Sequence, residues 1–244
     1  MRQSLSIIGI GAFGEFILKH LIPYFDVHVY DAHRDLSHIT ALYNVAEVPL
    51  EDAGKSDIVI IAVPVRAIEG VAKSIAPHLR AGQLVMDVAS VKTLPANILS
   101  AELPEDVDLI GLHPLFGPQS GKGGIYGQNI ALVNIRGSRD DNIAAFMERQ
   151  LGLNVIRCTA REHDEQMAYV QGLTHMIARV FQMMDLPEIT QETKTFSLLR
   201  QMVNIVKDDS DELFRAIQTD NPYVGETKEK FFDAVKALEA GLKG

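Results

Sequence analysis

The chain has 244 residues, a length that fits one large domain or two modest ones. It is 47% apolar and 23% charged, as globular proteins are, and its net charge of −9 argues against binding to nucleic acid or to an anionic membrane surface. The single cysteine, Cys158, excludes an intrachain disulfide framework and fits a reducing compartment. A strand is expected within the first few residues and no apolar run reaches transmembrane length. We therefore expect no signal peptide and a cytoplasmic location.

Residues 5–31 predict a strand, a glycine turn, a helix and a second strand. Residues 5–8 form a short, mainly apolar run that suits a buried parallel strand. Residues 12–21 suit the helix, and residues 27–30 suit the second strand. The turn has the pattern G-x-G-x-x-G, which in a strand–turn–helix unit places a pyrophosphate at the helix N-terminus. The alternative is a structural turn without a ligand. The predicted cofactor contacts here are Gly9, Ile10, Gly11, Ala12, Phe13, Gly14 and Asp31.

Asp31 ends the second strand, where an acid holds the adenosine ribose hydroxyls of a bound dinucleotide. A carboxylate at this place disfavours the 2′-phosphate of NADP, so NAD is the predicted cofactor. NADP stays possible, because His33 and Arg34 follow directly and would hold that phosphate if Asp31 turned away. Alternatively, His33 and Arg34 belong to a solvated loop.

Two further parallel strands are predicted at residues 57–63 and 84–88, with a helix at 66–78 between them. Pro64 ends the first of these strands at the carboxyl edge of the sheet, where cofactors lie in open α/β sheets. We therefore add Ala62, Val63 and Pro64 to the predicted cofactor site. Ser90 follows the second strand at the same edge, as a functional hydroxyl, as the N-cap of a helix, or as both.

His113 follows a predicted strand at residues 109–112 and is held by Pro114. A histidine fixed at a strand end is well placed for acid–base chemistry, although a loop histidine with a structural role fits equally. A strand at 130–134, a helix at 138–151 and a strand at 155–158 complete the first domain. The predicted fold for residues 1–159 is therefore an α/β, doubly wound, mostly parallel Rossmann sheet that binds a dinucleotide.

Residues 160–244 predict a small all-helical domain. A capping box, Thr159-x-x-Glu162, precedes a helix at 160–184, and helices at 187–206, 209–218 and 223–242 follow. The first helix carries two faces. One is an apolar stripe, and the other either lines a ligand cleft or is simply wet. Because so small a domain often buries its apolar stripes against a partner chain, we predict a homodimer. The stripe contains Met167, Val170, Leu173, Ile177, Val180, Phe181 and Met184, and the second face contains Asp164, Ala168, Gln171, His175 and Gln182.

Six segments together resemble the prephenate and arogenate dehydrogenases, most closely the plant-type members. Residues 113–121, HPLFGPQSG, are similar to the family's H-P-M-F-G-P-x-S-G signature, and residues 87–92, DVASVK, to its D-x-x-S-V-K segment. Residues 162–164, EHD, and 171–175, QGLTH, resemble the E-H-D and Q-x-x-T-H pattern of the helical domain. Residues 193–199, TKTFSLL, with the Asp-Ser pair at 209–210, resemble T-K-G-Y-x-x-L-L and D-S. The resemblance covers nearly the whole chain.

The resemblance implies an oxidative decarboxylation in tyrosine biosynthesis, in which a cyclohexadienyl acid passes a hydride to NAD(P) and loses CO2. By the same resemblance His113 hydrogen-bonds the ring hydroxyl and acts as the acceptor, so activity should fall in acid. Ser90 orients His113 or that hydroxyl, while Gln171 and His175 hold the substrate. We also assign Gln119 to the substrate site. We predict no metal site.

One departure from the family concerns the substrate's ring carboxylate. Many bacterial members bind it with an arginine in a G-G-F-[KR]-D-x-x-R segment, which this chain lacks. Arg179, one turn from His175, and Arg200 are the candidate substitutes, and each is otherwise a surface arginine.

Two alternative functions stay open at this point. One is a different nicotinamide-dependent reductase, acting on imines or β-hydroxy acids. The other is a non-catalytic dinucleotide-binding dimer. Whether the substrate is prephenate or arogenate also stays open, because a few side chains around its tail decide that choice.

Overall fold

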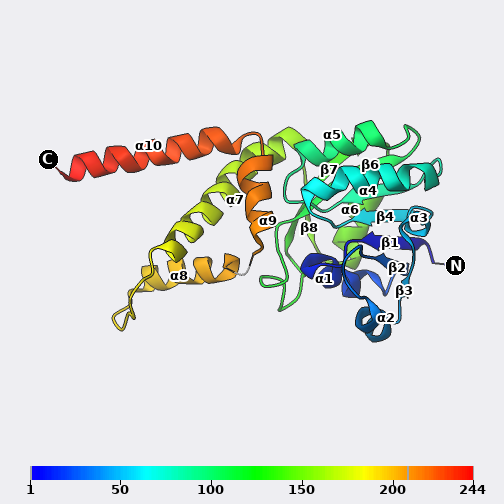
Figure 1. Ribbon diagram of the computed structural model, residues 1–244, viewed down its shortest axis with the longest axis horizontal. Coiled ribbons are helices and arrows are strands. Elements are labelled where there is room, and N and C mark those ends of the chain that lie inside the picture. Colours follow the sequence, from blue (N-terminus) through cyan, green and yellow to red (C-terminus); the bar gives the residue numbers. More distant parts are fainter. Residues whose placement is uncertain (1, 208, 244) are drawn as a thin grey trace. The chain divides into compact units, whose positions relative to one another are not determined.

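The computed structural model describes residues 2–207 and 209–243. The chain divides into two compact units, Met1–Arg161 and Glu162–Gly244 (Figure 1). No helix within the described ranges combines the length and the apolar character that a membrane crossing needs.

Unit 1 is built on a sheet that has eight strands in the described residues, in the order β3-β2-β1-β4-β5-β6-β7-β8. Neighbouring strands are parallel except β6 and β7, which are antiparallel. This arrangement confirms the predicted mostly parallel, doubly wound fold. The strands are β1 (Ser4–Ile8), β2 (Asp26–Tyr30), β3 (Ala46–Glu47), β4 (Ile58–Ile61), β5 (Leu84–Asp87), β6 (Asp108–Pro114), β7 (Asn129–Arg136) and β8 (Asn154–Arg157).

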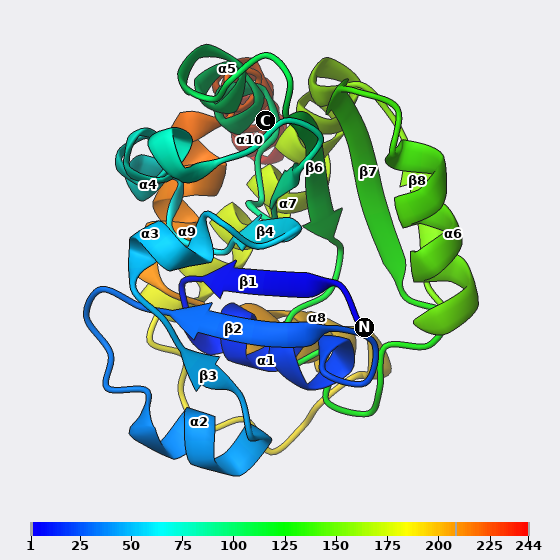
Figure 2. The same cartoon turned by 90° about the vertical axis from the view of Figure 1, so that its right-hand side faces the viewer.

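Helices cover both faces of the sheet, and each face has its own apolar core (Figure 2). α1 (Ala12–Leu21), α2 (Ser37–Tyr43) and α6 (Asp140–Gln150) contribute to the core on one face. α3 (Leu50–Ala53), α4 (Ile68–Ile75) and α5 (Thr93–Glu102) contribute to the core on the other. The central strands β1 and β4 are buried on both faces, which is why β4 is a continuous apolar run and β1 is apolar apart from its two serines.

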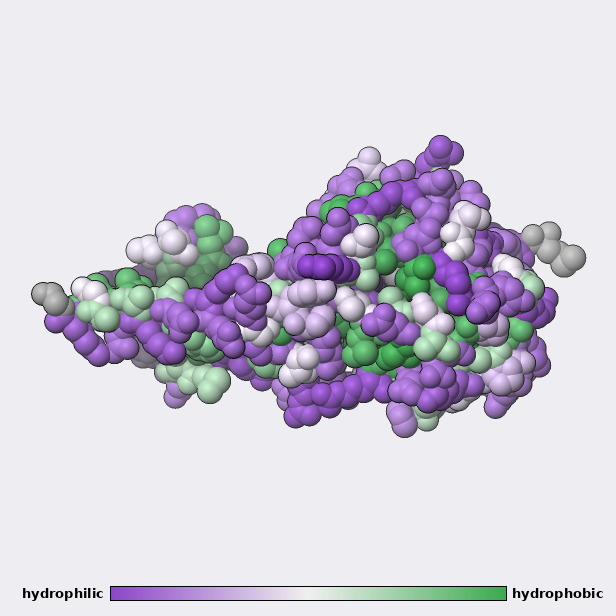
Figure 3. Space-filling model, turned by 90° about the horizontal axis from the view of Figure 1, so that it is seen from above, coloured by the Kyte–Doolittle hydropathy of each residue, from purple (hydrophilic) through white to green (hydrophobic). Residues whose placement is uncertain are grey.

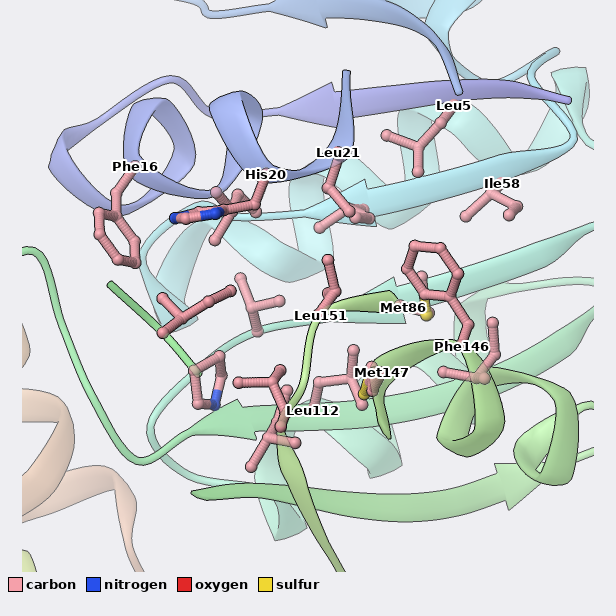
Figure 4. A pocket seen from close by; sticks show the side chains of 18 of the residues that line it. Leu5, Phe16, His20, Leu21, Ile58, Met86, Leu112, Phe146, Met147 and Leu151 are labelled. Atoms are coloured by element: carbon pink, nitrogen blue, oxygen red, sulfur yellow. The ribbon is translucent and has the colours of Figure 1, made fainter. Parts of the chain in front are cut away.

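A cavity of about 80 Å³ lies in the first core, between α1, α6 and the sheet (Figure 4). Its lining is apolar apart from His20, whose Nε2 is buried and has no hydrogen-bond partner among the described residues. Burial, followed by the charge of Lys19, lowers the pKa of His20 below its usual 6.5 and so favours the neutral ring. The cavity belongs to the packing of α1 against the sheet and not to the glycine turn.

The sequence patterns did not predict some of the elements of unit 1. The helix α5 was not predicted, and its N-cap is Lys92, so the N-cap role considered for Ser90 is wrong. The helices α2 and α3 and the two-residue strand β3 are too short to show a period. The predicted strands and longer helices of this unit all appear within a few residues of their expected bounds.

Unit 2 is helical throughout its regular structure, with α7 (Ala160–Met183), α8 (Lys194–Val206), α9 (Asp211–Arg215), a π-helical turn η3 (Ala216–Asp220) and α10 (Val224–Leu242). The predicted helix at 187–206 is wrong in its first seven residues. Thr193 takes the N-cap instead, and its side chain accepts a hydrogen bond from the Phe196 N–H. Ser210 caps α9 in the same way through the Leu213 N–H.

Side-chain hydrogen bonds to backbone carbonyls hold η3, and the residue that follows it, against α7. Gln218 Nε2 donates to Gly172 O over 2.8 Å, and Asn221 Nδ2 donates to Asp164 O over 2.8 Å. Gly172 permits the approach, since a Cβ there would lie 2.9 Å from a methyl of Val224. Both amides are buried, so these bonds also satisfy their polar groups.

The apolar stripe of α7 stays partly in solvent. Val170 is 58% exposed and Val180 47%, whereas Asp164 and Ala168 on the second face are buried. α10 likewise exposes apolar side chains, which lie among hydrophilic ones along this helix (Figure 3). They include Phe232, Val235, Leu238 and Leu242, and several large apolar side chains exposed on one helix are typical of an interaction face.

Candidate functional site

The glycine turn after β1 is packed too closely for side chains at two of its three glycines. Gly9 has φ +98°, and a Cβ there would lie 2.6 Å from Ala62 O. A Cβ on Gly14 would lie 2.0 Å from Gly9 O, which is a backbone atom and cannot move aside cheaply. Gly11 faces open space instead. The turn therefore brings β1, α1 and the end of β4 together and leaves room in front of its middle glycine.

The N-terminus of α1 faces this open space. α1 begins at Ala12, and its N-cap Gly11 supplies no side-chain hydrogen bond. The first N–H groups of a helix have no intrahelical partner and carry the positive end of the helix dipole. These residues fit the pyrophosphate of a dinucleotide, because they combine an anion-binding helix end with space where a Cβ would otherwise stand.

Asp31 at the end of β2 is held by three backbone donors. Its Oδ2 accepts from Ile10 N over 2.8 Å, and its Oδ1 accepts from His33 N and Arg34 N over 2.9 and 3.0 Å. Partial burial raises the pKa of Asp31, but these three hydrogen bonds outweigh burial and the net shift is downward. The carboxylate is thus charged and fixed beside the glycine turn, in the position predicted for a ribose ligand.

Ser90 and His113 lie at the carboxyl ends of adjacent strands. β5 and β6 are parallel, with Asp87 opposite Gly111, so Ser90 stands three residues and His113 two residues beyond this pair. Both side chains are buried, His113 at 5% and Ser90 at 8% exposed. The same edge holds the glycine turn after β1 and residues 62–64 after β4. The residues predicted for cofactor and catalysis therefore share one edge of the sheet.

A buried ion pair, Asp87–Lys92, connects two neighbouring strand ends at this edge of the sheet. The Lys92 ammonium contacts Asp87 Oδ1 and donates to Leu112 O over 2.7 Å, and the two side chains are 1% and 0% exposed. Asp87 Oδ1 also accepts from Ala89 N over 3.0 Å. Gly111 leaves space for the lysine stem, since a Cβ there would lie 3.1 Å from Lys92 Cδ. The pair thus joins the turn that carries Ser90 to the residue before His113.

Sequence reasoning assigned no role to Asp87 or Lys92, although the signal was present. An acid and a lysine stand inside an otherwise apolar stretch, five residues apart. Charged residues are almost never fully buried unless they are paired, so two of them in a core segment indicate a buried pair.

The candidate substrate residues of unit 2 lie along α7. Gln171, His175 and Arg179 are spaced by four residues, so they share one face of the helix. Burial lowers the pKa of His175 below its usual 6.5, and the charge of Arg179 lowers it further. Asp209 Oδ2 lies 3.7 Å from His175 Nδ1 and favours the charged ring, but this carboxylate is partly solvated and burial dominates.

Each of the two candidate arginines already has an acidic partner. Arg179 Nη2 lies 2.9 Å from Asp211 Oδ1, and its guanidinium stacks over the Phe214 ring at 4.6 Å. Arg200 Nη2 lies 2.7 Å from Glu192 Oε2. An anionic ligand would have to exchange with these acids.

Gln119 lies in the loop after β6 and is exposed. The turn around it is closed by the Gly117 N–H, which donates to Ser120 Oγ over 2.9 Å. Its backbone is thus ordered, while its side chain faces solvent.

Two protein-family models match the chain. Residues 25–131 match the nucleotide-binding domain of prephenate dehydrogenase, and residues 159–243 match the prephenate dehydrogenase dimerization domain. The glycine turn at residues 9–14 precedes the first matched range.

Named relatives and a solved structure agree with these models. The chain is 28% identical to arogenate dehydrogenase 1, chloroplastic, of Arabidopsis thaliana over 100% of its length and 40% of the relative's. It is 30% identical to a probable arogenate/prephenate dehydrogenase of Methanocaldococcus jannaschii, over 80% of its length and 45% of the relative's. The chain thus spans less than half of either relative. The fold matches prephenate dehydrogenase from Aquifex aeolicus in complex with hydroxyphenyl propionate and NAD+, with a TM-score of 0.76 at 19% identity, covering 98% of this chain and 90% of that one.

The contacts at Gly14 predict a defect in both stability and ligand binding. Gly14→Ala should lower the free energy of unfolding by about 1–3 kcal/mol, as overpacking does, and weaken dinucleotide binding by displacing the turn. Gly70→Ala is the matched control, because Gly70 is exposed in α4 and a Cβ there meets nothing within 4 Å. Thermal unfolding and calorimetric titration with NAD+ measure both effects. Equal behaviour of the two variants would contradict the packing argument.

The buried ion pair predicts a large effect of removing its cation. Lys92→Met should destabilise unit 1 by about 3–5 kcal/mol, because the Asp87 charge stays buried without this ammonium. Lys73→Met is the control: Lys73 also pairs with acids, Glu69 and Glu102, but on the surface. Urea unfolding followed by circular dichroism should show a much lower midpoint for Lys92→Met and almost no change for the control. An unchanged midpoint for Lys92→Met would show that the pair is not needed for the fold.

Proposed function

The chain belongs to the prephenate dehydrogenase family, and we propose that it catalyses the oxidative decarboxylation of prephenate or arogenate with hydride transfer to NAD, giving 4-hydroxyphenylpyruvate or tyrosine, CO2 and NADH. We assign dinucleotide binding to residues 1–159, and substrate binding and dimerisation to residues 160–244. The observation that supports this most directly is the placement of His113 and Ser90. Both are buried at the sheet edge that also holds the glycine turn and Asp31.

Bound NAD would supply the hydride acceptor. The chain's own contribution begins with His113, since a neutral imidazole has one ring nitrogen that can accept a proton. His113 takes the proton of the substrate's ring hydroxyl while the hydride leaves the ring carbon that carries this hydroxyl. The bond from the ring to its carboxylate then breaks, CO2 departs, and the electron pair completes the aromatic ring. The ring oxygen recovers a proton from His113 and becomes a phenol.

The surroundings of His113 suit this role. Its burial excludes water from the reacting groups, and the Lys92 bond to Leu112 O fixes the backbone one residue before it. We assign to Ser90 the orientation of the hydroxyl or of the His113 ring. His113 lies in β6, and Ser90 follows the adjacent strand β5 on a turn that Asp87 holds through Ala89 N, so the sheet edge and this turn set their spacing.

For the substrate's carboxylates we propose the shared face of α7. Gln171 and His175 offer hydrogen bonds, and Arg179 offers a charge after exchange with Asp211. Arg200 and Gln119 are further candidates, Arg200 after exchange with Glu192. Arg179 is favoured over Arg200, since it stands one turn from His175 on the same helix.

We further propose that the chain forms a homodimer through its helical unit. The match to a dimerization-domain model supports this, as do the apolar side chains exposed on α7 and α10. A monomer would leave these faces in water, at a cost of about 25 cal/mol per Å² of apolar area that a partner would bury.

Replacement of His113 tests the enzymatic proposal. His113→Asn keeps a hydrogen-bonding group but removes the base, so kcat should fall by about 10²- to 10⁴-fold while NAD+ binding persists. His38→Asn, at an exposed position of α2, is the control and should keep full activity. NADH formation with prephenate and with arogenate measures both variants and identifies the preferred acid. A fully active His113→Asn would remove His113 from this role, and dinucleotide binding without turnover of either acid would favour a non-catalytic dinucleotide-binding dimer.

A charge on α10 tests the dimer. Leu238 is 66% exposed, so Leu238→Glu should leave the fold intact but weaken the interface and shift the mass in light scattering from two chains to one. Leu42→Glu, at a 59% exposed leucine of α2 in unit 1, should leave the mass unchanged. A wild-type chain that is monomeric at micromolar concentration would contradict the proposal.

A further inference from the structure

An ion pair lies directly beside the fixed Asp31 carboxylate. Arg34 stands three residues after Asp31, and its Nη1 donates to Ile10 O inside the glycine turn over 2.6 Å. The same Nη1 lies 2.8 Å from Glu15 Oε2, in the first turn of α1. Arg34 is therefore folded back over the turn, at the end of the site where Asp31 would meet the adenosine ribose.

The Asp31 side chain cannot turn away to make room for NADP in place of NAD. Three backbone N–H groups already occupy three of the roughly four acceptor positions of its carboxylate. Rotation of the side chain would break all three bonds, so the carboxylate stays where a ribose hydroxyl can use its last position. A 2′-phosphate would meet this fixed negative charge.

Arg34 is a cation placed where it could bind such a phosphate, but Glu15 already pairs with its guanidinium. A guanidinium matches phosphate oxygens well, because its N–H groups form a planar fork. Both members of the pair are partly exposed, Arg34 at 43% and Glu15 at 33%, so a ligand can reach them. The Glu15 carboxylate, however, competes for the guanidinium and adds a second negative charge near the same ribose.

We propose that the Glu15–Arg34 pair sets the choice between NAD and NADP, with Glu15 acting against the 2′-phosphate by holding Arg34 on the Ile10 carbonyl. This inference rests on the proposed dinucleotide site. It assigns to Glu15 a role that the G-x-G-x-x-G pattern does not contain, since Glu15 follows the last glycine.

Calorimetric titration of the full chain with NAD+ and with NADP+ tests the pair without relying on turnover. Glu15→Gln should tighten NADP+ binding about tenfold, while NAD+ binding changes by no more than about threefold. Arg34→Gln should weaken NADP+ binding, and the double variant should lose the gain of Glu15→Gln. Thermal unfolding verifies that each variant is folded.

Glu69→Gln is the matched control, because Glu69 also lies in the first turn of a helix and pairs with a cation, Lys73, but on α4. It should leave both affinities unchanged. An unchanged NADP+/NAD+ ratio in Glu15→Gln would overturn the inference, and so would a gain that survives in the double variant. Either result leaves the dehydrogenase proposal standing. Failure of the wild-type chain to bind either dinucleotide would overturn both.

Discussion

The contact between Lys92 and the carbonyl of Leu112 is the interaction on which the geometry of one sheet edge depends, the edge where Ser90 and His113 lie. A buried ammonium loses several kcal/mol of hydration, and its carboxylate partner loses a similar amount, so such a pair seldom adds net stability over apolar side chains of the same shape. What it supplies is a fixed relation between two strand ends. One end carries Ser90 on a turn that Asp87 also holds, and the other carries His113.

At the proposed cofactor site, close packing in the glycine turn fixes the positions of the backbone groups. Gly9 and Gly14 let β1, α1 and the end of β4 approach until no Cβ fits, and Gly11 keeps the space in front of the helix end open. The adenosine end of the site is then set by hydrogen bonds, since Asp31 is aligned by the backbone and not by another side chain. Packing thus shapes the proposed phosphate site, and backbone donors fix the carboxylate that we propose as the ribose ligand.

Most of the fold of unit 1 could be predicted from sequence because its signals are local. Apolar strands at residues 5–8 and 58–61 are recognisable without knowledge of their neighbours, and so is the glycine turn between a strand and a helix. The Asp87–Lys92 pair leaves a signal of the same local kind, two charges five residues apart in an apolar stretch, whereas the Glu15–Arg34 pair depends on how the first turn of α1 meets the loop after β2. In unit 2 the start of α8 was misplaced, because residues 187–193 lack a decisive breaker within the run and the Thr193 cap settles the boundary. The burial on α7 also escaped prediction, because it depends on how η3 and α10 dock onto the helix.

A chain of net negative charge needs local cations to bind the anionic ligands that we propose, and its cations fall into two groups, exposed and buried. Arg34, Arg179 and Arg200 each have an acidic partner at the surface, Glu15, Asp211 and Glu192 respectively. Exposed pairs of this kind contribute little to stability, so a substrate carboxylate could replace the acid beside Arg179 or Arg200 at small cost. Arg34 is also bonded to the Ile10 carbonyl, and there we propose that Glu15 opposes a 2′-phosphate. Lys92 is also paired, but its ammonium is sealed from solvent and bonded to the backbone as well, so no ligand can exchange with it. Burial therefore separates the cation that holds the site together from the cations that are available to recognise what enters it.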